Sequence, residues 1–236
     1  MCEVLAVAAP AAIAFREVAP WAGEMERLGI AGFGWGAAWI DDGVVRRYRS
    51  ERSFAEDPNR DDALRDVRSS RFLVHLRRPN RLSTLQLADT QPFVERELFA
   101  FCHNGFLQRH LDFRPRYEYR LEGRADSEVG FAYFAEQVTH GTAPAGALRE
   151  VHERFGGNAN LGYLGSDGEL LIYGGHADNP PWRFAVDGCT VAATALHSDD
   201  QSLFDMLFTD ATDRVRVGRE VVRIEPAVSA EVRQAR

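Results

Sequence analysis

Strand-like segments at both ends of this chain enclose two helical segments, and this order constrains its fold more than any other feature. Residues 2–8 form an apolar run typical of a buried strand, and strand-like runs separated by Gly, Asp and Pro occupy residues 159–226. Residues 126–140 and 145–155 carry apolar side chains at helical spacing. This segregation of strands and helices predicts one α+β domain with two sheets and flanking helices.

The first half of the chain is expected to mix strands and helices, with one long polar connector. Asn-Gly, Gly and Pro positions mark most of the boundaries between these elements. The expected elements are a helix over residues 11–28 interrupted by Pro20, a hairpin over 32–50, a short helix over 61–69, a strand over 71–76, and a strand over 98–105 that ends in an Asn-Gly turn. The connector over residues 77–91 has a length typical of a functional loop.

The composition argues against several classes of function. The net charge is -7, which disfavours a surface that follows the phosphates of a nucleic acid. No apolar stretch reaches the roughly 18–20 residues that a membrane helix requires. The cysteines are far apart, and neither they nor the histidines show metal-ligand spacing. We therefore expect a cytoplasmic protein that needs no metal or other cofactor.

Cys2 directly follows the initiator methionine. Removal of Met1 would leave a thiol and a free α-amino group on one residue, with ordinary pKa values of about 8.5 and 7.7–8.0. The amine could then accept the thiol proton, which is the smallest arrangement of a nucleophile with an adjacent base. The alternative is a small apolar residue that opens a strand, and Cys2 taken alone favours this alternative.

Three further motifs each allow a structural and a functional interpretation. Asn104-Gly105 is typical of a tight turn, but its side-chain NH2 and backbone N–H would also suit an oxyanion hole. Arg77 follows a predicted strand, where it is either a solvated loop charge or a group that grips a carboxylate. Asp126 begins a predicted helix, where it either caps the helix or binds a substrate ammonium group.

The order of these motifs resembles the class II glutamine amidotransferase domain, a member of the N-terminal nucleophile hydrolases, and in particular its short stand-alone branch. The matching segments follow the family's order and cover nearly the whole chain. They are Cys2, GFGWGAAWIDDG (32–43), DTQPF (89–93), FCHNGFL (101–107), RADSE (124–128), NLGYLGSDGELLIY (160–173), TVAAT (190–194) and VVRIEP (221–226). The resemblance implies a four-layer αββα sandwich with two mainly antiparallel sheets, formed by residues 1–236 as a single domain.

The resemblance also implies a role for each motif. Cys2, once its preceding methionine is removed, would attack the side-chain amide of glutamine, with its own α-amino group as general base. Asn104 and Gly105 would donate hydrogen bonds to the oxyanion. Arg77 would grip the substrate α-carboxylate, and Asp126 would hold the α-ammonium group. A γ-glutamyl thioester would form with release of ammonia, and water would hydrolyse it to glutamate.

Two positions depart from the family's pattern. Asn80 stands where the family often has Thr or Ser, and Ala125 stands where Thr is usual. Both positions border the expected pocket for the amino-acid head group, so the substrate stays open between glutamine and another γ-glutamyl compound. We further predict that Asn80 and His103 contact the substrate.

Three functions are therefore compatible with the sequence. The first is a glutaminase-type amidohydrolase, with a separate ammonia-accepting synthase as its possible partner. The second is a γ-glutamyl hydrolase that acts on a thiol-pathway intermediate, similar to the ergothioneine-pathway enzymes. The third is a catalytically silent regulatory or scaffold domain, which retention of Met1 would favour. The two enzymatic functions predict a small-molecule substrate, and none of the three predicts a nucleic acid or membrane partner.

Overall fold

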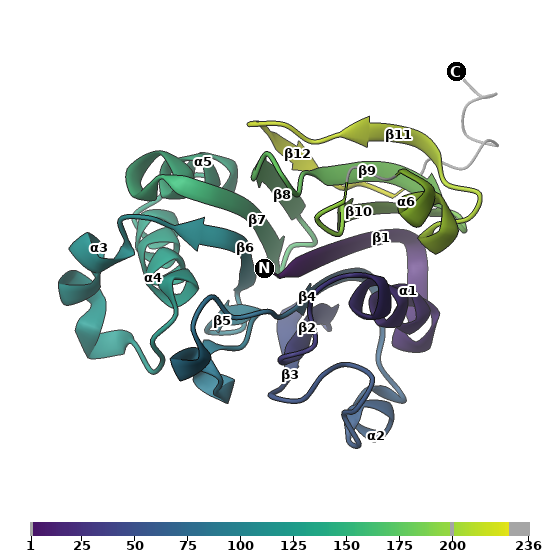
Figure 1. Cartoon of the computed structure of the whole chain (residues 1–236), viewed down its shortest axis with the longest axis horizontal. Coiled ribbons are helices and arrows are strands. Elements are labelled where there is room, and N and C mark those ends of the chain that lie inside the picture. Colours follow the sequence, from purple (N-terminus) through teal and green to yellow (C-terminus); the bar gives the residue numbers. More distant parts are fainter. Residues whose placement is uncertain (1, 199–200, 227–236) are drawn as a thin grey trace.

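The computed structural model describes residues 2–198 and 201–226, which form two stacked β-sheets with helices on both outer faces (Figure 1). Three separate apolar clusters account for this layering. One lies between α1 (Phe15–Leu28), α6 (Gln201–Leu207) and the larger sheet, a second lies between the smaller sheet and its helices, and a third lies between the two sheets. The predicted α+β sandwich of four layers is confirmed.

The larger sheet has seven strands in the order β11-β9-β10-β1-β4-β2-β3. All its paired neighbours are antiparallel, and β1 lies near the centre between β10 and β4. Its strands are β1 (Glu3–Ala14), β2 (Trp35–Asp41), β3 (Val44–Ser50), β4 (Arg68–Leu76), β9 (Pro181–Val186), β10 (Cys189–Thr194) and β11 (Thr212–Arg216).

The smaller sheet has five antiparallel strands in the order β12-β8-β7-β6-β5. Its strands are β5 (Phe93–Glu95), β6 (Phe99–Leu107), β7 (Gly157–Gly165), β8 (Leu170–Gly175) and β12 (Val221–Arg223). The other helices are α2 (Arg60–Leu64), α3 (His110–Tyr117), α4 (Asp126–Thr139), α5 (Pro144–Phe155) and the short 3-10 helices Leu82–Thr84, Leu87–Asp89 and Glu118–Arg120.

Alternation along β1 sets which side chains face the second sheet. Val4 and Ala6 belong to the cluster between the sheets, whereas Leu5 and Val7 belong to the cluster beneath α1. Successive side chains of a strand point to opposite faces. Cys2, two positions before Val4, therefore starts on the face that meets the second sheet.

Three boundaries differ from the sequence-based expectation. The helix expected over residues 11–28 begins at Phe15, because β1 pairs with β4 again at Ile13 and Ala14 after an irregularity, and Pro20 lies inside the helix without interrupting it. The strand expected to end at Asn104-Gly105 continues to Leu107, since β6 pairs with β7 along its full length. The expectation of a turn there is wrong.

The remaining differences concern helices. The helix expected over residues 61–69 covers Arg60–Leu64, because β4 already begins at Arg68. Two helices, α3 and α6, were not expected from the sequence. In α3, Pro115 and several charged residues mask the helical spacing of its few buried side chains.

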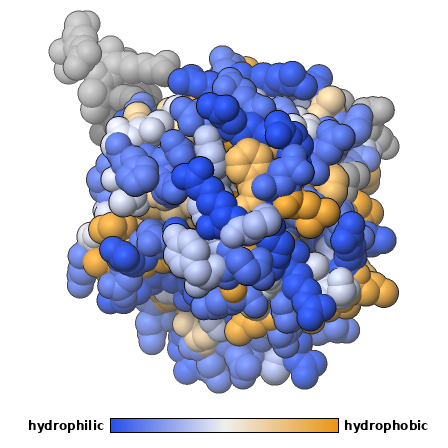
Figure 2. All heavy atoms as spheres, turned by 90° about the vertical axis from the view of Figure 1, so that its left-hand side faces the viewer, coloured by the Kyte–Doolittle hydropathy of each residue, from blue (hydrophilic) through white to orange (hydrophobic). Residues whose placement is uncertain are grey.

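Figure 2 shows a mainly hydrophilic surface on the side of the molecule that carries α3 and α4, with hydrophobic side chains in small groups. Within the described residues, no helix combines the length and apolar character that crossing a bilayer demands. The predictions about compartment and partners stay predictions.

Substitution Gly162→Ala is expected to destabilise the contact between the sheets. A Cβ at this position would lie 2.7 Å from Cys102 Sγ and 2.8 Å from Leu73 Cδ1. Such overpacking typically lowers the free energy of unfolding by about 1–3 kcal/mol. Denaturant titration measures the loss, with Gly146→Ala in α5 as the control because its Cβ would approach no described atom closer than 3.4 Å. Equal stability of the two variants would contradict the close sheet contact.

Candidate active site

Cys2 lies where the central strand of the larger sheet begins. β1 pairs with β4 so that Glu3 stands opposite Leu76, and Cys2 and Arg77 therefore follow on as neighbours at the end of the two strands. The thiol lies against the next residue of the loop, with the Arg78 backbone N–H 3.4 Å and the Arg78 carbonyl oxygen 3.5 Å from Sγ. The strand register thus fixes the position of the sulfur.

Burial raises the pKa of the Cys2 thiol to about 11, although the Arg78 N–H lowers it. The thiol therefore keeps its proton at neutral pH, and a reaction at sulfur would need a base to remove it. In the sequence the Cys2 nitrogen is part of the peptide bond to Met1, which lies outside the described residues. The removal of Met1 stays a prediction.

Arg77 is buried, with 4% of its surface exposed, and it is anchored on one side. Its Nη2 donates to the backbone oxygen of Thr84 and, at 2.9 Å, to the Thr84 hydroxyl. A guanidinium has five N–H donors, and the three on Nε and Nη1 have no hydrogen-bond partner among the described residues. Burial lowers the pKa of Arg77 while Cys2 and Asp89 oppose the shift. Arg77 is therefore a cation held in one position, and its Nε and Nη1 donors are available to a ligand.

Asn104 and Gly105 lie inside β6 on the facing sheet. The Asn104 side chain is buried, and its Nδ2 donates to the backbone oxygen of Cys2. Gly105 has a φ of 137°, and a Cβ there would lie 2.0 Å from the Asn158 carbonyl oxygen. Only glycine fits this close approach, so the dipeptide that resembles a turn is a distorted strand beside Cys2.

Asp126 is the first residue of α4, and its Oδ2 accepts the backbone N–H of Leu107 at 2.7 Å. The side chain is 13% exposed and its Oδ2 lies 3.9 Å from His103 Nδ1. The carboxylate thus ties the start of α4 to the end of β6. Its Oδ1 accepts no hydrogen bond from the described residues and is free to accept one from a ligand.

His103 and Asn80 support the same region. His103 Nε2 lies 3.3 Å from the Asn158 carbonyl oxygen, which can only accept, so this nitrogen carries the proton and Nδ1 accepts from the Ser127 hydroxyl at 3.0 Å. Burial lowers the pKa of His103, although Asp126 opposes the shift. Asn80 Nδ2 donates to the Gly105 carbonyl at 3.2 Å, which links the loop after β4 to β6.

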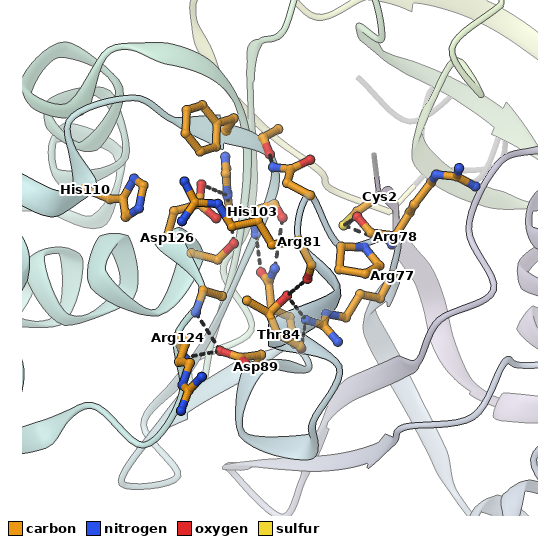
Figure 3. Close-up of a pocket in the computed structure, with 17 residues that line it drawn as sticks. Cys2, Arg77, Arg78, Arg81, Thr84, Asp89, His103, His110, Arg124 and Asp126 are labelled. Carbon is orange, nitrogen blue, oxygen red and sulfur yellow. Dashed lines mark hydrogen bonds and ion pairs between the residues drawn. The ribbon is translucent and has the colours of Figure 1, made fainter.

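A pocket of about 60 Å³ joins these residues. Figure 3 shows Cys2 and Arg77 on one side of it and Asp126 and His110 on the other. Cys2, Arg77, Asn80, His103, Gly105 and Asp126 all line it, whereas Asn104 lies behind it against the Cys2 carbonyl. A cation and a carboxylate on opposite walls suit the α-carboxylate and α-ammonium groups of a small amino acid.

Asp89 lines the pocket too, and sequence analysis did not single it out. It is fully buried, and its Oδ1 accepts the backbone N–H groups of Arg124 at 2.5 Å and Ala125 at 2.6 Å. These hydrogen bonds fix the backbone of the two residues that precede Asp126. The DTQPF segment, which begins at Asp89, was the available signal, but its role depends on a contact 36 residues along the chain.

The described residues contain no cluster of three or more His, Cys, Asp or Glu side chains that could hold a metal ion. Cys102 and Cys189 are buried free thiols, and burial raises the pKa of both. Both therefore stay protonated inside the apolar clusters.

Comparison with known proteins found matches among solved structures. No protein-family model matches the sequence, and no curated protein matches it. Glutamine phosphoribosylpyrophosphate amidotransferase from B. subtilis, complexed with ADP and GMP, aligns with 95% of this chain and 46% of its own, at a TM-score of 0.70 and 15% identity. A glutamine aminotransferase class-II domain protein from Silicibacter pomeroyi aligns with 96% of this chain and 100% of its own, at a TM-score of 0.59 and 17% identity.

The chain has the fold of a class II glutamine amidotransferase domain. A structure described as the allosteric regulatory enzyme of purine biosynthesis agrees, with a TM-score of 0.67, 15% identity and coverage of 95% of this chain and 45% of its own. The chain spans less than half the length of this enzyme and of the B. subtilis enzyme. At such identities the likeness concerns the fold, and the activity and substrate are matters for a proposal.

A buried polar network lies behind Cys2 in this amidotransferase fold. The Glu3 carboxylate, which is fully buried, accepts hydrogen bonds from the Thr194 hydroxyl and, at 3.1 Å, from Asn179 Nδ2. Asn160 Nδ2 donates to the Asn179 carbonyl at 2.6 Å and to Asn104 Oδ1 at 2.7 Å. Glu3, Asn179 and Asn160 were not predicted as site residues, because they are far apart in sequence and each is an ordinary polar residue taken singly.

The variant Glu3→Gln is expected to change how stability depends on pH. Burial raises the pKa of Glu3 from 4.5 to about 7, although Thr194 and Asn179 oppose the shift. Between these pH values the folded chain holds a proton that the unfolded chain has lost, so the free energy of unfolding falls as pH rises. The wild type should lose about 3 kcal/mol relative to the variant across this interval.

Denaturant titrations at pH 4.5 and pH 7.5 measure this difference. Glu153→Gln, which alters an exposed carboxylate, is the matched control and should follow the wild type. Parallel pH profiles for the wild type and Glu3→Gln would contradict a raised pKa at Glu3.

Proposed function

We propose that the chain is an amidohydrolase that cleaves a γ-glutamyl amide, as a glutaminase or glutamine amidotransferase, through Cys2. One observation carries this proposal: Cys2, Arg77, Gly105 and Asp126, which come from four separate segments, line a single pocket. The family resemblance implies that Cys2 is the nucleophile and that Gly105 donates to the oxyanion. It also implies that Arg77 binds the substrate α-carboxylate and Asp126 the α-ammonium group. The amidotransferase fold supports the proposal.

The mechanism starts with Cys2 as the N-terminal residue. Its thiol has a raised pKa, so the α-amino group takes the thiol proton as Sγ attacks the γ-carbonyl carbon. The Gly105 N–H and the Asn104 Nδ2–H donate to the oxyanion of the tetrahedral intermediate. Asn104 Nδ2 already lies at the Cys2 backbone carbonyl, beside the nucleophile.

Collapse of the intermediate breaks the C–N bond. The α-ammonium group of Cys2 returns the proton to the leaving nitrogen, which departs as ammonia when the substrate is glutamine. A γ-glutamyl thioester remains on Sγ. Water then attacks the thioester, the α-amino group takes a proton from this water and passes it to sulfur, and glutamate leaves.

The head group of the substrate is expected to bridge the pocket. The α-carboxylate would accept from the Arg77 Nε and Nη1 donors, and the α-ammonium group would donate to Asp126 Oδ1. Holding this end fixes the distance of the γ-carbonyl from Cys2 Sγ, and such positioning converts binding energy into rate. A separate synthase would be the acceptor of ammonia if the enzyme is an amidotransferase.

Loss of Met1 and labelling of Cys2 test the nucleophile. We expect intact-mass analysis to show complete removal of Met1, because the small side chain at position 2 permits it. An electrophilic glutamine analogue should modify the wild type once and Cys2→Ala not at all, since Cys102 and Cys189 are buried. Glutamate release should fall by at least about a thousandfold in Cys2→Ala. Retained Met1, or equal labelling of the two proteins, would contradict the mechanism.

Variants Arg77→Gln and Asp126→Asn test the head-group contacts. Each removes the charge-assisted part of one head-group contact, and a hydrogen bond to a charged group is worth about 1.5–3 kcal/mol, so kcat/KM should fall by at least roughly tenfold to a hundredfold, mainly through KM. Glutamate release from a panel of γ-glutamyl compounds that includes glutamine measures the effect and identifies the substrate. Arg52→Gln and Asp66→Asn, at exposed positions, serve as controls. Unchanged KM in both site variants would exclude this binding mode.

A further inference from the structure

Asn160 occupies the position directly opposite Asn104 in the smaller sheet. The register of β6 and β7 pairs these two residues, so their side chains emerge on the same face of the sheet. Both side chains are buried, with at most 1% of either residue exposed. The 2.7 Å bond from Asn160 Nδ2 to Asn104 Oδ1 is therefore shielded from water.

The surroundings of Asn160 allow a single orientation of its amide. Its Oδ1 accepts the backbone N–H of His176 at 3.1 Å, and its Nδ2 donates to two oxygens, Asn104 Oδ1 and the Asn179 carbonyl. A flipped amide would place its NH2 group against the His176 N–H and its oxygen against the other two oxygens. Because buried polar groups without partners are costly, the flip is strongly disfavoured.

The fixed amide of Asn160 then fixes the amide of Asn104. An N–H donor from Asn160 requires the oxygen of Asn104 on that side, which leaves the Asn104 NH2 group facing Cys2. Without Asn160, only the hydrogen bond to the Cys2 carbonyl would oppose a 180° turn of the Asn104 amide, which would present its oxygen to the nucleophile. A carbonyl-type oxygen there would repel an oxyanion instead of stabilising it.

Asn179 holds the other end of this arrangement. Its Oδ1 accepts the backbone N–H of His197 at 3.0 Å, and its Nδ2 lies 2.8 Å from His197 Nε2 and 3.1 Å from Glu3 Oε2. The Asn179 carbonyl that accepts from Asn160 is thereby fastened to β1 through Glu3, the residue next to Cys2. Hydrogen bonds thus link the Cys2 carbonyl through Asn104, Asn160 and Asn179 to Glu3, and the peptide bond between Glu3 and Cys2 closes the ring.

We infer that Asn160 is a positioning residue, which sets the direction of the Asn104 amide so that its NH2 group faces the reacting carbonyl oxygen. The expected effect of Asn160 on the rate rests on the proposed function. The orientation of the Asn104 amide does not depend on that function, because it follows from the hydrogen bonds. Asn160 touches neither substrate nor sulfur and acts through Asn104.

Steady-state kinetics of Asn104→Ala, Asn160→Leu and the double variant measure this role. Loss of one oxyanion donor costs about a hundredfold to a thousandfold in kcat, which we expect for Asn104→Ala. Asn160→Leu should lower kcat by about tenfold to a hundredfold, because the Asn104 amide then keeps only its bond to the Cys2 carbonyl and is held less firmly, while KM stays within about twofold. The double variant should be no slower than Asn104→Ala alone, since both changes remove the same interaction. Asn59→Leu, an exposed site far from the pocket, is the matched control.

Several results would overturn the inference. These are an unchanged kcat in Asn160→Leu, an effect confined to KM, or effects of the two single variants that multiply in the double variant. If Asn160 had only a structural role, the losses of kcat in the two single variants would multiply in the double variant, and the melting temperature would fall.

Hydrogen exchange of the Asn160 side-chain amide in the wild type provides a second measurement that needs neither activity nor a folded variant. NMR should show both Asn160 amide protons exchanging slowly with water, because each is buried and bonded. Fast exchange would refute the fixed orientation. If the wild type hydrolyses no γ-glutamyl compound but the exchange is slow, the proposed function and the kinetic role fail while the orientation stands.

Discussion

Close packing of two sheets through small side chains is the constraint on which the site depends. Ala6, Ala38 and Ala100 lie between the sheets beside larger aliphatic side chains, and at Gly162 an added Cβ would lie 2.7 Å from Cys102 Sγ. Because the sheets are close, the start of β1 in one sheet meets the middle of β6 in the other. The hydrogen bond from Asn104 to the Cys2 carbonyl crosses this junction and joins the two sheets at the candidate nucleophile.

The polar groups at this junction are buried, and hydrogen bonds to one another stabilise most of them. Glu3 is one exception, since its Oε1 has no hydrogen-bond partner among the described residues and its pKa is raised to about 7. A buried carboxyl group of this kind costs stability when it ionises. Such a cost is common where a structure holds functional groups in place, and it fits a network that orients Asn104.

Much of the fold follows from local patterns in the sequence. Apolar runs identified β1 and β4, strand-like runs between Gly, Asp and Pro positions identified the strands after residue 157, and helical spacing identified α4 and α5. The boundaries were less accurate, because strand pairing extended β1 to Ala14 and β6 to Leu107, and pairing partners lie far away in the sequence. The Asn-Gly dipeptide shows this most clearly, since β7 keeps it within a strand.

The sequence by itself determined the α+β class and named Cys2, Arg77, Gly105 and Asp126, because their motifs occur in an order that resembles one family. Tertiary structure alone decided that these residues share a pocket, and it alone revealed Asp89, Glu3, Asn160 and Asn179. The physical reason is that a polar residue acquires its role from its partners. Asn160 is an ordinary strand residue until the register of β6 and β7 places it opposite Asn104.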